Sequence, residues 1–294
     1  MNSPIDNSML VNNNTILPEL LGFPSPFFPT SGRLRVLEPL DLTINELYQQ
    51  VLDGSYGKPF IIEHKKLRSL HFSPTHIQSA MDIDQPDALN LRYTQMMMSF
   101  LLFKPNPGII VMLGLGGGSL AKFCYRALPD AFIAVVEIDP HVITLRRHFA
   151  IPDDDDRFRV IRADAAEFVA HATDPIDILL ADAFDTHGLA ESVSGQNFLL
   201  MAHAALAATG ILVMNLAGDF SSHVELIKQA GEVFNRQILV VSVKDDGNYV
   251  LFAFKQRGFE PNWREMKQRA KELKALHDLD FPAFMQKMAH AALG

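Results

Sequence analysis

The sequence predicts an α/β fold: a seven-stranded, Rossmann-like sheet preceded by a small N-terminal antiparallel β-domain. Two observations support this prediction. After Gly108, apolar runs alternate with helical patterns, which is typical of βαβ units around a parallel sheet. The last two apolar runs are separated by Asp246-Gly247, a two-residue hairpin signal. The final strand should therefore run antiparallel to its neighbour.

The seven runs of this sheet are short and rich in β-branched and aromatic residues. They lie at residues 109–113, 132–138, 158–161, 176–182, 211–217, 238–244 and 248–254. Five strands joined by helices and closed by a hairpin are the layout of the class I S-adenosylmethionine-dependent methyltransferase fold. The closing hairpin distinguishes this layout from that of dinucleotide dehydrogenases.

Four segments are expected along the chain. They are an extended arm rich in Asn, Ser and Pro (1–32), the β-domain (33–87), the Rossmann-like domain (88–257) and C-terminal helices packed outside the sheet (258–294). The β-domain should contain four short strands and one helical stretch, TINELYQQVL, closed by Gly54. A helix over 88–103, with a Met-rich run that suits a core, should lead into the Rossmann-like domain.

Composition excludes several classes of protein. With 48% hydrophobic and 20% charged residues, the chain of 294 residues is an ordinary globular protein. A formal charge of −8 provides no basic field for nucleic acid. One cysteine, Cys124, allows no internal disulfide and suits a reducing compartment, so a cytoplasmic location is expected. The chain shows neither a signal-peptide pattern nor an apolar run of eighteen residues, so no membrane partner is expected.

The strongest functional signal is the loop Gly114-Leu-Gly-Gly-Gly-Ser119 between a buried strand and a helix. Glycines at 114, 116 and 117 let the backbone approach a ligand closely, and free N–H groups at a helix start attract polar groups. Glu137, next to Ile138 at the end of the second strand, lies 23 residues after Gly114. Its carboxylate can accept hydrogen bonds from both hydroxyls of a ribose, so the pair predicts an adenosine-containing ligand.

A third acid, Asp164, follows the third strand and precedes Ala165. Its carboxylate could accept a hydrogen bond from an adenine amino group. Capping of the following helix is an equally good explanation, because Asp is preferred at that position.

Two more acids, Asp182 and Asp185, follow the fourth strand in the segment DAFDTHGL. Because open α/β sheets bind ligands beyond the carboxyl ends of their strands, these acids should overhang the reactive part of the ligand. They could hold a cationic amine and accept its proton. His187, in the same loop, would titrate near neutral pH, although an exposed loop histidine is an ordinary finding.

Two other patterns have ordinary explanations. The run Asp153–Asp156 lacks the glycine and terminal glutamate of a calcium loop and is expected to be a solvated loop. The eleven histidines show no metal-binding spacing, so no metal is expected.

The chain resembles the spermidine synthases and their relatives, the aminopropyltransferases. The likeness runs from about Tyr56 to Phe254. The matching pieces are Ile77-Gln78, Tyr93 with Met96, the glycine loop, Glu137-Ile138-Asp139, Asp164, Phe168, Asp182, Asp185, Gly188 and Ala190-Glu191.

The resemblance implies roles for these residues. Gln78 and Glu137 would hold the nucleoside of the donor, and Asp164 would bind its adenine. Asp182 would orient and deprotonate the attacking amine, while Tyr93 and Asp185 would line the acceptor channel. The donor would be decarboxylated S-adenosylmethionine or S-adenosylmethionine itself, the acceptor a small amine, and the protein a homodimer.

The chain also departs from the family pattern. Gly117 replaces an aspartate that holds the ammonium group of the donor, and DAFDTHGL lacks two serines and two prolines of the family loop. Asn215 stands near a family glutamine, and the tyrosine-bearing loop before the last strand shrinks to residues 244–248. These losses, with apolar Phe184 and Leu189 at the entrance, favour an acceptor with one amine and an apolar body over putrescine.

The resulting hypothesis is a spermidine-synthase-like transferase that moves an aminopropyl-type group to an amine. Two alternatives remain at this point: an S-adenosylmethionine-dependent methyltransferase and a nucleoside-binding protein without turnover.

Overall fold

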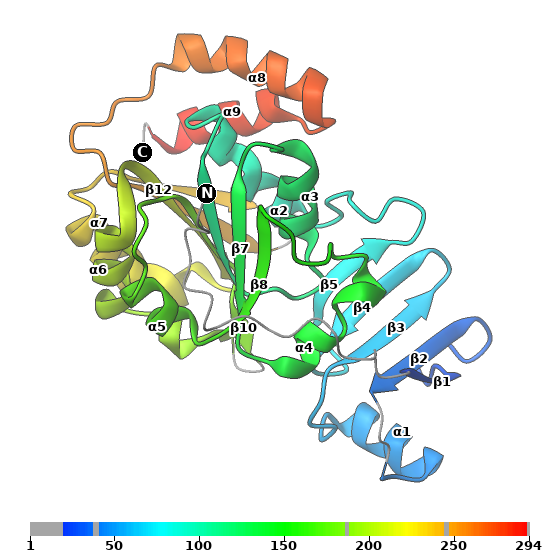
Figure 1. Cartoon of the computed structure of the whole chain (residues 1–294). Helices are drawn as coiled ribbons and strands as arrows, with labels where there is room; N and C mark the ends of the chain where they lie inside the picture. The colour runs from blue at the N-terminus through cyan, green and yellow to red at the C-terminus, as the bar shows by residue number, and fades with distance from the viewer. Residues whose placement is uncertain (1–19, 38–40, 186–187, 244–246, 293–294) are drawn as a thin grey trace.

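A computed structural model describes residues 20–37, 41–185, 188–243 and 247–292. A seven-stranded sheet lies at its centre (Figure 1). Its strands, in spatial order, are β13 (Ile238–Val243), β14 (Asn248–Phe254), β12 (Leu206–Ala217), β9 (Ile176–Ala181), β6 (Ile109–Leu113), β7 (Phe132–Glu137) and β8 (Phe158–Arg162). All neighbouring pairs are parallel except those of β14, which runs antiparallel to both β12 and β13. The predicted sheet and its reversed strand are confirmed, although residue 246 of the hairpin signal lies outside the described residues.

Helices cover both faces of the sheet. One face packs against α5 (Ala165–Ala170), α6 (Gln196–Ala205) and α7 (Val224–Val233). The other face packs against α2 (Arg92–Met97), α3 (Ser119–Ala127), α4 (Pro140–Thr144), α8 (Trp263–His277) and α9 (Phe281–Ala291). Short 3₁₀ turns complete the layers: η2 (Met98–Leu102), η3 (Arg146–Phe149), η4 (Glu191–Val193) and η5 (Phe220–His223). The expected C-terminal helices are therefore present outside the sheet.

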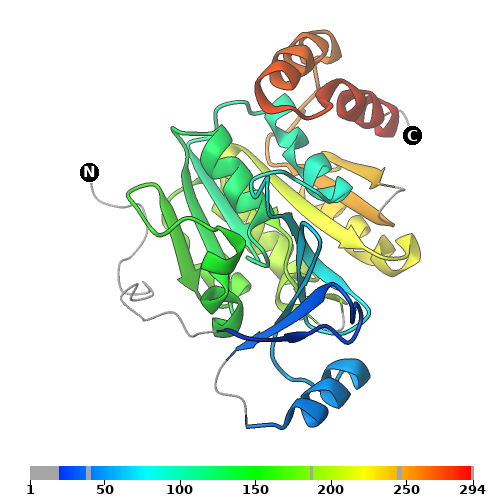
Figure 2. The ribbon, with the colours of Figure 1, turned by 90° about the vertical axis from the view of Figure 1, so that its right-hand side faces the viewer.

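The N-terminal unit is a second sheet of five antiparallel strands in sequential order. They are β1 (Leu20–Pro24), β2 (Gly32–Leu37), β3 (Phe60–His64), β4 (Leu67–His71) and β5 (Ile77–Asp82), with helix α1 (Ile44–Asp53) between β2 and β3. A capping box of Thr43 and Glu46 starts α1, and Gly54 ends it with a φ of 81°. Figure 2 shows this unit, in blue, at the opposite end of the molecule from α8 and α9.

Strand β1 corrects the expected arm. Residues 20–24 pair with β2 along their whole length, so the sheet has five strands and not four. The Asn- and Pro-rich composition of residues 1–32 hides this strand, but Leu21 and Phe23 pack against the small core of the unit. Residues 1–19 lie outside the described residues.

The helix expected over 88–103 is shorter and divided. It begins at Arg92 and tightens into η2 after Met97. The Met-rich run is core, as expected, since Met96, Met97 and Met98 are almost wholly buried. The 3₁₀ turn η2 packs against both α8 and α9. Its backbone is wound more tightly than that of an α-helix.

The four-aspartate run is also not simply solvated. Asp154 is buried and pairs with Arg146 at 2.8 Å, while Asp153 pairs with Arg147 at 3.1 Å. Asp155 accepts a 2.6 Å hydrogen bond from the hydroxyl of Tyr125. These contacts hold the connection from η3 to β8 against its neighbours. In the described part of the chain, no helix is long and apolar enough to cross a membrane.

Candidate active site

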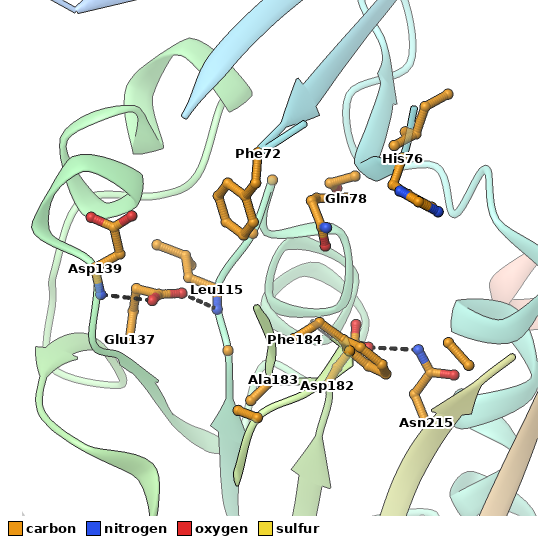
Figure 3. A pocket seen from close by; sticks show the side chains of 18 of the residues that line it. Phe72, His76, Gln78, Leu115, Glu137, Asp139, Asp182, Ala183, Phe184 and Asn215 are labelled. Atoms are coloured by element: carbon orange, nitrogen blue, oxygen red, sulfur yellow. Dashed lines mark hydrogen bonds between the residues drawn. The ribbon is translucent and has the colours of Figure 1, made fainter. Parts of the chain in front are cut away.

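A cavity of about 1500 Å³ lies beyond the carboxyl ends of β6, β7, β9 and β12 (Figure 3). The N-terminal unit supplies a further wall through β5. The structure brings together most of the predicted site residues in its lining: Gln78, Tyr93, Gly114, Gly116, Gly117, Glu137, Ile138, Asp164, Ala165 and Asp182. Asp185 belongs to the short strand β10 (Phe184–Asp185), but its side chain is not described, and His187 lies outside the described residues.

The glycine loop runs between Glu137 and Asp182. Gly114 has a φ of 93°, and a Cβ at this position would collide with the main-chain carbonyl of Asp182. Its N–H donates to the carbonyl oxygen of Val136 at 2.8 Å. Only glycine fits this junction of three strands, so the loop stays close to the floor of the cavity.

Two main-chain groups fix the carboxylate of Glu137. Oε2 accepts a 2.9 Å hydrogen bond from the N–H of Leu115, and Oε1 accepts one of the same length from the N–H of Asp139. Burial raises the pKa of Glu137 above its usual value, although these hydrogen bonds oppose the rise. Each oxygen can accept one more hydrogen bond. Together the two oxygens can therefore bind the two hydroxyls of a ribose.

Asp164 is the N-cap of α5. Its Oδ1 accepts hydrogen bonds from the N–H groups of Ala166 at 2.9 Å and Glu167 at 3.0 Å. The capping alternative is therefore confirmed. Because both contacts use one oxygen, a role toward adenine stays a prediction. Ile138, 63% exposed, also lines the cavity and adds an apolar surface to it.

Asp182 is held by side chains from two other elements. The Nδ2 group of Asn215 on β12 donates to its Oδ1 at 2.8 Å, and the hydroxyl of Tyr93 on α2 donates to its Oδ2 at 3.3 Å. Asn248 on β14 donates in turn to Oδ1 of Asn215 at 2.7 Å. Burial raises the pKa of Asp182, and the hydrogen bonds from Asn215 and Tyr93 act in the opposite direction. The result is an oriented, partly buried carboxylate suited to accept a proton.

Sequence reasoning treated Asn215 only as a departure from a family pattern and did not single out Asn248 or Ser79. Asn215 and Asn248 are 2% and 7% exposed. Buried amides in otherwise apolar strands need partners, and this signal was present in the runs ILVMNLA and NYVLFAF. Their partners could not be named without the register that places Asn215 beside Asp182.

Of the two apolar side chains expected at the acceptor entrance, Phe184 and Leu189, only Phe184 lines the cavity. In Figure 3, Phe184 lies beside Asp182 in the cavity. Leu189, in strand β11 (Gly188–Leu189), pairs with Phe184 but packs against the core on the α5–α7 face. The cavity wall therefore gains one apolar side chain from this hairpin and not two. Among the described residues, no group of three or more His, Cys, Asp or Glu could hold a metal ion.

Comparison with known proteins adds the family context. Residues 90–243 match the model of the spermine/spermidine synthase domain. A polyamine aminopropyltransferase of Chromobacterium violaceum is 33% identical over 78% of this chain and 88% of its own. One of Neisseria meningitidis is 33% identical over 80% of this chain and 90% of its own. The eEF1A lysine and N-terminal methyltransferase of Xenopus laevis is 26% identical over 65% of this chain and 31% of its own.

Solved structures agree on the fold. A probable spermidine synthase from Corynebacterium glutamicum superposes with a TM-score of 0.59 at 19% identity, over 88% of each chain. A spermidine synthase in complex with the transition-state analogue AdoDATO gives 0.54 at 16% identity, over 92% of this chain and 87% of that one. Human methyltransferase-like protein 13 in complex with SAH gives 0.54 at 23% identity, over 63% of this chain and 88% of that one.

Proposed function

Because the chain belongs to the spermine/spermidine synthase family, we propose that it is a transferase that moves an aminopropyl-type group from an adenosyl sulfonium donor to an amine. The observation that carries this proposal is the geometry of Asp182. Its carboxylate lies at the cavity, oriented by Asn215 and Tyr93, where an amine beside the donor would present its proton.

The donor fits the other half of the cavity. Glu137 would bind the ribose with the lone pairs that Leu115 and Asp139 leave open, and the glycine loop lets the sulfonium approach the backbone. Gln78 and Asp164 also line the cavity, and we expect them to contact the nucleoside. A sulfonium supplies a carbon activated toward attack and a neutral thioether as leaving group.

The reaction needs an unprotonated amine held in line with the carbon–sulfur bond. Asp182 would supply both requirements, because it orients the amine by hydrogen bonding and accepts its proton. The nitrogen–carbon bond forms, the carbon–sulfur bond breaks with its electron pair on sulfur, and methylthioadenosine leaves.

Product chromatography tests this proposal. The protein is incubated with an amine and either decarboxylated S-adenosylmethionine or S-adenosylmethionine. Methylthioadenosine is the expected nucleoside product. S-adenosylhomocysteine alone would instead identify a methyltransferase, the second candidate, which the Xenopus relative favours.

A third candidate, a binding protein without turnover, makes a different prediction. It would bind the donor and yield no product with any amine.

For the acceptor, we propose an amine with an apolar body in place of putrescine, because Phe184 lines the cavity beside Asp182. An aliphatic monoamine should therefore give a higher kcat/KM than putrescine. Spermidine formation from putrescine at about 10⁴ M⁻¹s⁻¹ or more, the ordinary enzyme range, would contradict this choice.

We also propose that the protein acts as a homodimer in the cytoplasm. Among the described strands, β1 forms an edge of the N-terminal sheet, which favours association, and the single cysteine suits a reducing compartment.

A further inference from the structure

One end of the cavity is closed where β5 meets the glycine loop. Ser79 on β5 is 6% exposed and faces Gly117. A Cβ at Gly117 would lie 2.6 Å from Oγ of Ser79 and 3.0 Å from a ring carbon of Phe149. A side chain at position 117 would therefore collide with the side chain of Ser79 unless that side chain moved.

The groups at this end are hydrogen-bond donors. The hydroxyls of Ser79 and Ser119 lie 3.4 Å apart, and both residues line the cavity. Ser119 is the first residue of α3, whose first-turn N–H groups have no partner within the helix. Gln78, the neighbour of Ser79, adds an amide.

Acidic groups are placed elsewhere in the cavity. Among its described lining residues the acids are Glu137, Asp139, Asp164, Asp182, Glu191 and Asp219. None of them comes from β5, from the glycine loop or from α3. A ligand tail that reaches this end meets hydroxyl and N–H donors and no carboxylate.

We propose that this end, formed by Ser79, Ser119 and the start of α3, binds the carboxylate of a donor that has not been decarboxylated. The inference rests on the proposed function and names its donor: S-adenosylmethionine, whose 3-amino-3-carboxypropyl group is transferred to the amine. With the ribose on Glu137 and the reacting carbon at Asp182, the chain beyond that carbon follows the glycine loop toward Ser79. A carboxylate there accepts hydrogen bonds from two hydroxyls and benefits from the positive end of α3.

The transfer step balances without any further reactant. The amine nitrogen attacks the chain carbon bonded to sulfur, and that carbon–sulfur bond breaks. Its electron pair stays on sulfur to give neutral methylthioadenosine, and the amine proton passes to Asp182. The product is an amine that carries a 3-amino-3-carboxypropyl group.

Calorimetric titration of the full chain with each of the two donors is the first test. S-adenosylmethionine should bind at least tenfold more tightly than its decarboxylated form. Ser79→Ala should weaken binding of S-adenosylmethionine about fivefold, the worth of one hydrogen bond, and leave the decarboxylated donor unchanged. Ser55→Ala is the matched control, because Ser55 is an exposed serine of the same N-terminal unit that does not line the cavity, and it should change neither affinity.

A second variant tests the steric part of the argument. In Ser79→Gly combined with Gly117→Asp, the side chain that comes nearest to position 117 is removed, and a carboxylate is added beside the ring of Phe149. This double variant should prefer the decarboxylated donor.

The outcomes separate this inference from the proposed function. Equal or tighter binding of the decarboxylated donor by the natural sequence, or an equal effect of Ser55→Ala, overturns the inference. Methylthioadenosine formed from the decarboxylated donor alone also overturns it and leaves the proposed function in place. S-adenosylhomocysteine as product, with tighter binding of S-adenosylmethionine, rejects the proposed reaction and supports the carboxylate site.

Discussion

The two halves of the cavity are built in different ways. In the donor half, main-chain N–H groups fix Glu137, one from 2 and one from 22 residues away. In the acceptor half, side chains from separate elements fix Asp182, from 33 and 89 residues away. A site organised by local backbone geometry leaves a motif in the sequence, whereas a site organised by contacts across strands does not. The donor half should therefore govern binding, and the acceptor half the chemical step.

Asp182→Asn gives the largest expected effect and the sharpest division between the halves. Loss of the proton acceptor should lower kcat by about 100- to 10,000-fold, the range for general bases. Donor affinity should stay within about threefold, because Glu137 and the glycine loop remain. Release of methylthioadenosine measures the first quantity and calorimetry the second. Asp130→Asn, an exposed loop substitution, is the control for the loss of one negative charge.

If Asp182→Asn weakens donor binding by as large a factor as it lowers kcat, the acceptor half does not act on the chemical step alone. The two halves would then act as one unit.

Glu137→Ala should produce the converse pattern. It removes the ribose acceptor and leaves the N–H groups of Leu115 and Asp139 without their partner. Donor binding should weaken by about 1.5 to 3 kcal/mol, the usual worth of hydrogen bonds to a charged group. Once the donor is saturating, kcat should fall much less.

Glu167→Ala removes a nearby acid that does not line the cavity and should leave donor binding unchanged. If Glu137→Ala binds the donor as well as the natural sequence does, the adenosine assignment is wrong.

The difference between the two halves also explains which features could be predicted from the sequence. Strands β6 and β14 have the predicted bounds, and the glycine loop and Glu137 stand at the predicted strand ends, because apolar alternation and strand order carry that information. Strand β1 and the buried Arg146–Asp154 pair were missed, since each depends on a tertiary partner that composition does not reveal. Asn215 was missed as the partner of Asp182 for the same reason.

The pH dependence of kcat/KM tests whether Asp182 in the acceptor half acts as the proton acceptor. Asp182 must be ionised to accept a proton, so activity should be lost as the pH falls through its pKa in the folded protein. Burial raises this pKa, while the hydrogen bonds from Asn215 and Tyr93 lower it. Asn215→Ala and Tyr93→Phe should each raise the pKa further and move the acid limb of the profile to higher pH.

At a pH well above the limb, both variants should recover part of their activity. Asn248→Ala, which acts on Asp182 through Asn215, should move the limb in the same direction by less. A uniform loss of activity at every pH would show that these residues support the structure and do not position the base.

The smallest effect on activity is expected from separating two copies of the chain. Strand β1 is an edge of the N-terminal sheet, and Phe28 and Leu67 of the same unit are 41% and 40% exposed although they are large and apolar. An edge strand without a neighbour among the described residues, together with exposed apolar side chains in the same unit, favours association, so sedimentation should give the mass of a dimer. Leu67→Lys should shift that mass toward the monomer. Since neither Leu67 nor β1 is among the described lining residues of the cavity, kcat should change less than about twofold. A monomer mass that does not depend on concentration would refute the association. A large loss of activity in the monomeric variant would show instead that both halves of the cavity depend on a second copy.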